Sequence, residues 1–150
     1  MNATASNRSD LVHDLAAVVV GGMLGTALRL AIELLVPHAD SEPPWGILAA
    51  NTAGALALGL LVGRVWPVAP DWLRAGLGAG LLGSFTTFSA VAVAVVGMTA
   101  ADQALQGLAY LAATLVLGFG AAALGLRVGR WHRRGGALAG AVDIIDGVNE

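Results

Sequence analysis

The sequence contains no cysteine and no lysine, and only 12% of its residues are charged. Without cysteine, the chain has no disulfide, no thiolate metal ligand and no cysteine nucleophile. A soluble domain carries about 25% charged residues, so this composition argues against a water-soluble globule and against disorder. The net charge of −2, with no basic face, also argues against a nucleic-acid-binding protein.

Hydrophobic residues make up 57% of the chain, and glycine occurs 21 times. A transmembrane helix needs roughly 20 apolar residues, and four runs are close to that length: residues 15–36, 46–63, 75–98 and 104–126. Glycine lets neighbouring membrane helices approach closely. We therefore expect an all-α integral membrane protein with four transmembrane helices. A polar N-terminal segment (1–14) precedes this membrane domain (15–128), and a partly disordered tail (129–150) follows it.

The arginines are distributed unequally about the predicted spans. With four spans, both termini and the second connector (66–72) share one side. Seven of the eight arginines belong to that side, whereas the first and third connectors (37–45 and 99–103) have none. The seven are Arg8, Arg64, Arg74, Arg127, Arg130, Arg133 and Arg134. The positive-inside rule then places both termini in the cytoplasm and fixes one orientation.

The third span contains the motif GSFTTFS at residues 83–89. Its cluster of hydroxyl groups after Gly83 predicts a break of the helix, and irregular backbone at membrane depth occurs only inside protein or beside a cavity. Carbonyl groups freed there can coordinate a small hard cation. The electropositive edges of phenylalanine rings can face an anion, so the motif suggests an anion path. Packed rings with hydroxyls bonded back to the helix are the alternative.

The first two spans contain isolated polar groups. Arg29 needs a partner or a water-lined niche at membrane depth, and Glu33, one turn later, can pair with it. A purely structural or snorkelling arginine is the alternative. Asn51 offers two N–H donors in an otherwise apolar helix. It either lines a pore or makes an interhelical hydrogen bond.

The fourth span has Tyr110, Thr114 and Gly118 on one stripe, since they are spaced at i, i+4 and i+8. This stripe either lines a narrow polar track or packs in the core. No set of residues typical of an enzyme accompanies these motifs, and the three histidines lie in predicted loops or tails. The sequence therefore does not indicate an enzyme.

Taken in order, three motifs resemble those of the Fluc/CrcB family of bacterial fluoride channels, over residues 15–128. The patterns are G-G-x-x-G-x-x-x-R at residues 21–29, G-x-L-x-x-N-x-x-G at 46–54 and G-x-x-T-T-F-S at 83–89. The resemblance implies two four-helix subunits packed antiparallel in the bacterial inner membrane, with two narrow pores. It implies passive export of cytoplasmic fluoride, which gives fluoride resistance.

The resemblance also implies roles for single residues. The fluoride pore would be lined by Asn51, Phe88, Ser89, Tyr110 and Thr114. A structural sodium ion at the dimer interface would be held by the main-chain carbonyls of Gly83 and Thr86. Arg29 would be structural or would tune the anion vestibule.

The third motif departs from the family pattern, which continues T-F-S and usually has a glutamate two residues later. Here Ala90, Val91 and Ala92 follow Ser89, and Ala94 stands at the glutamate position. An antiparallel homodimer also requires one chain in both orientations, which the arginine bias opposes. We therefore hypothesise a homologous partner subunit of opposite orientation, with a heterodimer favoured over a homodimer. A non-conducting partner subunit and a small multidrug-type proton-coupled transporter are the alternatives.

Overall fold

The computed structural model describes the backbone of residues 3–39 and 42–148 and the side chains of residues 10–39 and 42–131. Within these residues the regular structure is helical throughout. In chain order the elements are α1 (Ala3–Leu35), α2 (Trp45–Leu60), the π-helical η1 (Leu61–Val65), α3 (Asp71–Ala75), the π-helical η2 (Gly76–Leu82), α4 (Gly83–Phe85), α5 (Ser89–Ala100) and α6 (Ala104–Val148).

These elements form four segments that are long and apolar enough to cross a membrane: Asp10–Leu35, Trp45–Val65, Asp71–Ala100 and Ala104–Trp131. The second segment joins α2 to η1, and the third joins α3, η2, α4 and α5. The predicted all-α class and the four spans are confirmed. The chain is a multi-pass membrane protein.

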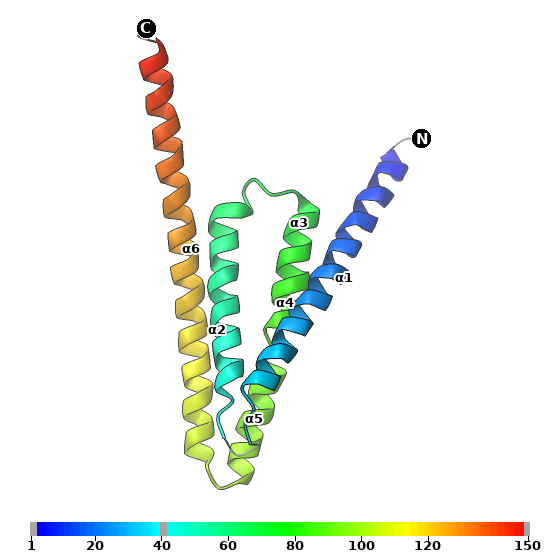
Figure 1. Cartoon of the computed structure of the whole chain (residues 1–150), viewed down its shortest axis with the longest axis vertical. Coiled ribbons are helices and arrows are strands. Elements are labelled where there is room, and N and C mark those ends of the chain that lie inside the picture. The colour runs from blue at the N-terminus through cyan, green and yellow to red at the C-terminus, as the bar shows by residue number, and fades with distance from the viewer. Residues whose placement is uncertain (1–2, 40–41, 149–150) are drawn as a thin grey trace.

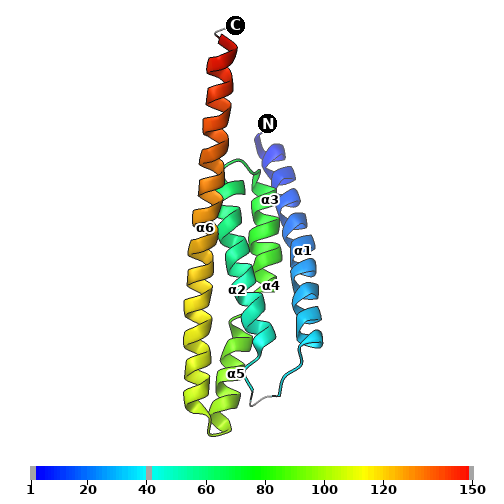
Figure 2. The same cartoon turned by 60° about the vertical axis from the view of Figure 1, so that its left-hand side comes forward.

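The spans run side by side along the long axis of the molecule (Figure 1). The start of α1, the connector between η1 and α3, and the end of α6 lie at one end, and the other two connectors lie at the opposite end (Figure 1). α6 packs along α2, and α1 crosses the third span (Figures 1 and 2). Both termini therefore lie at the end that holds the second connector, as a chain of four spans requires.

Glycine allows two of these helix pairs to pack at backbone contact. A Cβ atom on Gly21 of α1 would overlap the carbonyl oxygen of Gly76 in η2. A Cβ atom on Gly59 of α2 would likewise overlap the carbonyl oxygen of Ala122 in α6. Small residues at these crossings permit the close approach on which helix association in membranes depends.

The terminal helices extend beyond the predicted spans. α1 begins at Ala3, and α6 continues to Val148 through residues 129–148, which we expected to be partly disordered. Extending an existing helix avoids the cost of nucleating a new one, so the fourth span's helix continues past its apolar part. The functional division into residues 1–14, 15–128 and 129–150 stays a prediction.

Candidate functional site

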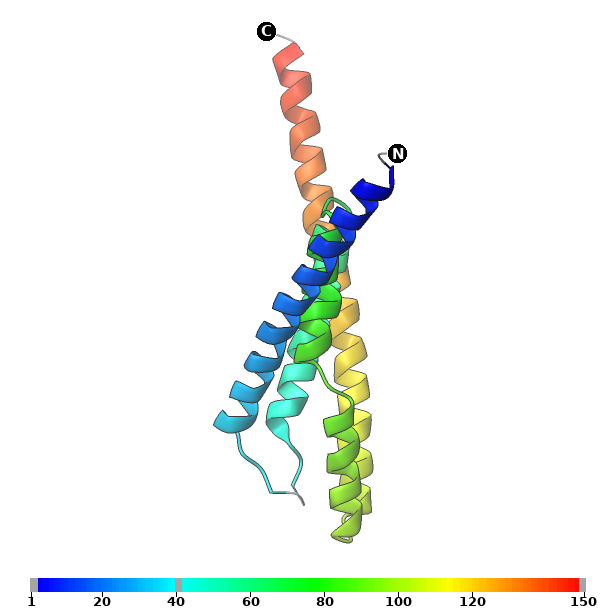
Figure 3. The same cartoon turned by 90° about the vertical axis from the view of Figure 1, so that its right-hand side faces the viewer.

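The third span loses its helical backbone between α4 and α5 (Figure 3). Thr86 is extended, with φ of −86° and ψ of 149°. The Leu82 carbonyl accepts both the Thr86 N–H over 3.0 Å and the Thr86 hydroxyl over 2.9 Å. After the break, Thr87 Oγ1 accepts the Ala90 N–H over 3.4 Å, in place of a helical carbonyl. The break therefore lies within the motif that the sequence singled out.

Asn51 of α2 pairs with the exposed backbone of this break. Its Nδ2 donates to the Thr87 carbonyl over 2.9 Å, and the Thr87 N–H donates to its Oδ1 over 2.8 Å. The carboxamide thus makes the two bonds that a neighbouring peptide group would make. The interhelical hydrogen bond, one of the two interpretations of Asn51, is present. The second N–H of the amide makes no hydrogen bond to the described residues.

Pairing with Asn51 also changes the carbonyl groups just before the break. In a continuous α-helix, the Thr87 N–H would donate to the Gly83 carbonyl, four residues earlier. Here it donates to Asn51 instead. The carbonyl of the extended Thr86 likewise accepts no hydrogen bond from the described backbone. Two main-chain oxygens within the third span therefore lack their helical donors, and they are candidate ligands for a small hard cation.

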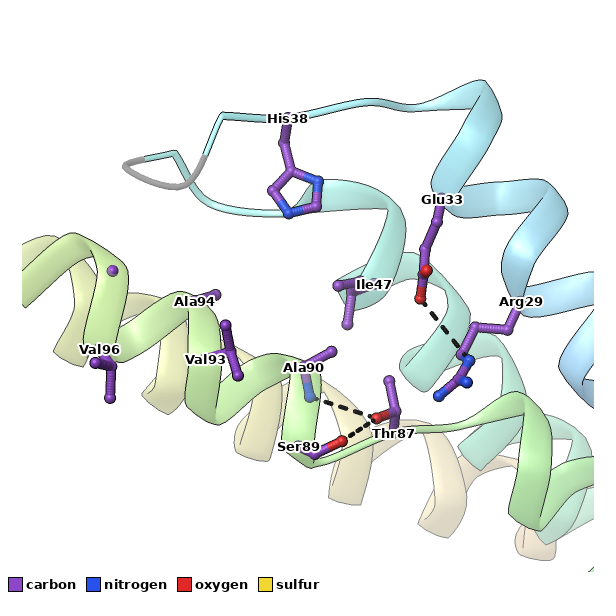
Figure 4. Close-up of a pocket in the computed structure, with 11 residues that line it drawn as sticks. Arg29, Glu33, His38, Ile47, Thr87, Ser89, Ala90, Val93, Ala94 and Val96 are labelled. Carbon is purple, nitrogen blue, oxygen red and sulfur yellow. Dashed lines mark hydrogen bonds and ion pairs between the residues drawn. The ribbon is translucent and has the colours of Figure 1, made fainter.

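A pocket of about 600 Å³ lies between α1, the first connector, α2 and α5 (Figure 4). We call it the Arg29 pocket. Its polar lining consists of Arg29, Glu33, His38, Thr87 and Ser89, and its remaining lining consists of Ile47, Ala90, Val93, Ala94, Val96 and Gly97. The hydroxyl oxygens of Thr87 and Ser89 lie 3.0 Å apart. A cation and two hydroxyl groups thus face one cavity beside the break.

The predicted pairing of Arg29 with Glu33 is present as a loose ion pair. Arg29 Nε lies 3.8 Å from Glu33 Oε1, and the two side chains are 32% and 36% exposed. This distance is too long for a hydrogen bond, and the buried Nε has no other acceptor among the described side chains and backbone. The guanidinium therefore keeps donor capacity toward the pocket.

A smaller pocket of about 260 Å³ lies between α2 and the η2–α4 part of the third span. Asn51 lines it together with Gly83 and Thr86, the two residues expected to hold sodium. A Cβ atom on Gly54, one turn after Asn51, would overlap the methyl group of Thr86. Close packing of α2 against the break thus brings the candidate anion donor and the candidate cation ligands together.

Phe88 and Ser89 lie on the outer surface of the protomer at the break. The Phe88 side chain is 65% exposed, and Ser89 is exposed as well. Ser89 lines the Arg29 pocket, whereas Phe88 does not. The Phe88 ring is therefore accessible on the protomer to lipid or to a partner subunit.

Tyr110 and Thr114 lie in the core of the protomer instead. Tyr110 is only 4% exposed, and its hydroxyl donates to the Pro44 carbonyl over 3.4 Å. The Thr114 hydroxyl donates to the Tyr110 carbonyl over 2.9 Å. Val91, at the family's second phenylalanine position, is fully buried in the same cluster. The structure thus shows core packing for Tyr110 and Thr114, whereas nothing lies within 4 Å of a Cβ atom on Gly118. The role of Tyr110 and Thr114 in a pore stays a prediction.

Two residues of the site were not assigned a role from the sequence. Thr87 supplies the backbone that binds Asn51, and the motif around it already indicated a break. His38 reaches the Arg29 pocket from the first connector. No sequence signal marks His38, because the path of a connector depends on how the helices it joins are packed.

The fold and site define a multi-pass helical membrane protein with an interrupted span beside a charged pocket. Residues 16–126 match the family described as CrcB-like protein, Camphor Resistance (CrcB). The chain belongs to this family.

Several similar proteins are named fluoride-specific ion channels. FluC of Paracoccus denitrificans is 36% identical, over 79% of this chain and 95% of its own length. FluC 2 of Nocardia farcinica is 35% identical, over 78% of this chain and 85% of its own length. FluC 1 of Rhodococcus jostii is 39% identical, over 82% of this chain and 90% of its own length. The names of these relatives denote channels, not enzymes.

Proposed function

We propose that this protein is a subunit of a fluoride-selective passive ion channel that exports cytoplasmic fluoride and gives fluoride resistance. The observation that carries the proposal is similarity along most of the chain to proteins named fluoride-specific ion channels. The break in the third span, whose backbone is hydrogen-bonded to Asn51, supports the same conclusion, because it places polar groups inside an otherwise apolar segment.

Fluoride is small and strongly hydrated, so a pore must offer donors in place of water. The second N–H of Asn51, the Ser89 hydroxyl and the electropositive ring edge of Phe88 are accessible donors at the break. Arg29 supplies positive charge at the adjoining pocket. Tyr110 and Thr114 join this set only if their hydroxyls exchange their present acceptors for an anion. Passive flow then follows the membrane potential, which drives anions out of a negative interior.

The carbonyl groups of Gly83 and Thr86 are the proposed ligands of a structural sodium ion at the dimer interface. Their loss of helical hydrogen-bond donors supports this assignment, because hard cations prefer oxygen ligands. The ion would supply a fixed positive charge at the centre of the assembly. The chain's own contribution is the extended Thr86, which keeps both oxygens out of the helical ladder.

The proposed location is the bacterial inner membrane, with both termini in the cytoplasm and lipid around the bundle. The proposed partner is a homologous subunit of opposite orientation, in a heterodimer. The arginine bias supports both statements, since it disfavours inserting one chain in both orientations. The numbered names FluC 1 and FluC 2 among the relatives fit organisms that hold more than one such protein. A homodimer is the alternative.

One observation favours a second candidate function, that of a non-conducting partner subunit. Val91 stands at the second phenylalanine position and is fully buried, so of the two ring positions of the family pattern this chain fills only the first, with Phe88. The proton-coupled transporter has no such support, since the carboxylate of Glu33 lies near the end of α1, two residues before its last residue, Leu35, and not at the middle of the span.

Fluoride efflux from liposomes tests the proposal. The chain alone, its homologue alone and the two together are reconstituted, and efflux is followed with a fluoride electrode, with chloride efflux as the control. We expect fluoride-selective efflux from the pair only. Efflux from the chain alone would establish a homodimer, and no fluoride efflux from any preparation would overturn the channel proposal. With efflux from the pair, Phe88→Ala in this chain separates a conducting subunit, which loses flux, from a non-conducting one, because the exposed ring of Phe88 contributes little to the packing of the protomer.

A further inference from the structure

Glu33 places a negative charge inside the pocket that holds Arg29. Both side chains line the pocket and point toward Thr87 (Figure 4). The first motif of the chain ends at Arg29, so Glu33 lies outside the three motifs and outside the proposed pore residues. A carboxylate at this place requires an explanation of its own.

The ion pair is arranged so that an anion can compete with the carboxylate. The 3.8 Å separation leaves Arg29 Nε without a hydrogen bond, and both side chains are about one-third exposed. Pairs with this exposure are stabilised only weakly, because water screens both charges. An anion that enters the pocket meets the same guanidinium and is repelled by the same carboxylate.

The rest of the pocket does not offset the charge of Glu33. From the first connector, His38 faces the pocket as the third titratable side chain. α2 contributes Ile47, and the third span contributes only hydroxyl and apolar side chains. The electrostatic field that an anion encounters is therefore set mainly by Arg29 and Glu33.

We propose that Glu33 sets the anion occupancy of the Arg29 pocket by acting as a built-in competitor for the guanidinium. Its carboxylate pairs with Arg29 when the pocket holds no anion and weakens the hold on each anion that enters. A conducting site must bind ions strongly enough to admit them and weakly enough to release them. Glu33 is thus an affinity-determining residue, and this inference rests on the proposed channel function.

The test compares Glu33→Gln with Asp71→Asn in the assembly that conducts. Asp71 forms an ion pair with Arg74 at 3.5 Å near the second connector, away from the pocket. Both substitutions remove one negative charge from an intrahelical pair, so only the position differs. The initial rate of fluoride efflux is measured against fluoride concentration. We expect Glu33→Gln to lower the half-saturating concentration about threefold, because charges in a cleft act strongly on local ion concentration, and Asp71→Asn to leave it unchanged.

A double-variant cycle identifies the group through which Glu33 acts. In an Arg29→Gln background, Glu33 has no guanidinium to compete for, and it can only repel the entering fluoride. The effect of Glu33→Gln on the half-saturating concentration should therefore shrink by half or more. Glu33→Asp, which keeps the charge, should resemble the wild type. Glu33→Ala repeats the loss of charge should Glu33→Gln fail to assemble.

Equal half-saturating concentrations for the wild type, the Glu33 variants and Asp71→Asn would overturn the inference while leaving the channel intact. An effect of undiminished size in the Arg29→Gln background would overturn the competition with Arg29. Failure of the channel proposal gives a different result, since the wild-type assembly itself would then show no fluoride efflux.

Discussion

Asn51 and Thr87 exchange two hydrogen bonds, of 2.9 and 2.8 Å, between a side chain of α2 and the main chain of the interrupted third span. A carboxamide carries a donor and an acceptor in one plane, as a peptide group does. It can therefore satisfy a backbone that has left the helix without a strand or a water beside it. The same residue holds the break open and keeps a further N–H for a ligand.

Replacing Asn51 should destabilise the fold as well as reduce flux. Asn51→Ala leaves the N–H and carbonyl of Thr87 unpaired, and each unsatisfied buried group costs about 1–3 kcal/mol. Thermal unfolding in detergent measures the loss. Thr52→Ala, the next residue of α2, is the control and should unfold close to the wild-type temperature. Equal unfolding temperatures for the two variants would contradict a structural role for the Asn51 bonds.

Phe88 should show the opposite behaviour, with a functional effect and little effect on the protomer. Its ring is 65% exposed, so Phe88→Leu should change protomer stability by no more than about 0.5 kcal/mol. Fluoride efflux from the assembled channel should fall at least tenfold, since leucine lacks the electropositive ring edge. Unchanged efflux would remove Phe88 from the pore.

Val91→Phe should not restore a second ring to the pore. Val91 is fully buried beside Met98 and Tyr110, and overpacking a core typically costs about 1–3 kcal/mol. We expect a lower unfolding temperature and no gain in efflux. Val91→Ile, which adds one methylene, is the milder control. A rise in efflux with unchanged stability would mean that the ring reaches the pore after all.

The contact of α2 with α6 should be intolerant of a single methyl group. A Cβ atom on Gly125 would overlap the carbonyl oxygen of Leu56, whereas nothing lies within 4 Å of one on Gly118 or Gly120. Gly125→Ala should therefore lower the yield of folded protein on size-exclusion chromatography. Gly118→Ala and Gly120→Ala, in the same helix, should not change the yield of the isolated chain. Equal yields for all three variants would show that the two helices separate at little cost.

Single introduced cysteines can test the orientation, because the native chain has none. In intact cells, His38→Cys should react with a membrane-impermeant maleimide, since the first connector is expected outside. Val68→Cys, in the second connector, should react only after permeabilisation. Replacing Arg64 and Arg74, which flank the second connector, and adding two arginines to the first connector should give mixed labelling at both positions. Labelling of both single-cysteine variants in intact cells would instead indicate dual insertion.

Much of this arrangement could be predicted from the sequence, because length and hydropathy define spans directly. The break at Thr86 and Thr87 was also predictable, since hydroxyl groups cluster there in an apolar run. The surroundings of Tyr110 and Thr114 could not be predicted. Spacing shows that two residues share a stripe of a helix, but the rotation of that helix about its axis decides where the stripe points. In α6 that rotation follows from backbone contact at glycine positions, which only the assembled fold displays.

The return of the chain to its starting side has a consequence for gene fusion. α1 begins and α6 ends at the same end of the molecule (Figure 1). Two copies joined head to tail by a short linker would thus enter the membrane facing the same way. A single polypeptide holding two opposed copies needs an odd number of additional membrane crossings between them. A linker of one extra apolar helix would provide this inversion, and two separate genes provide it without any linker.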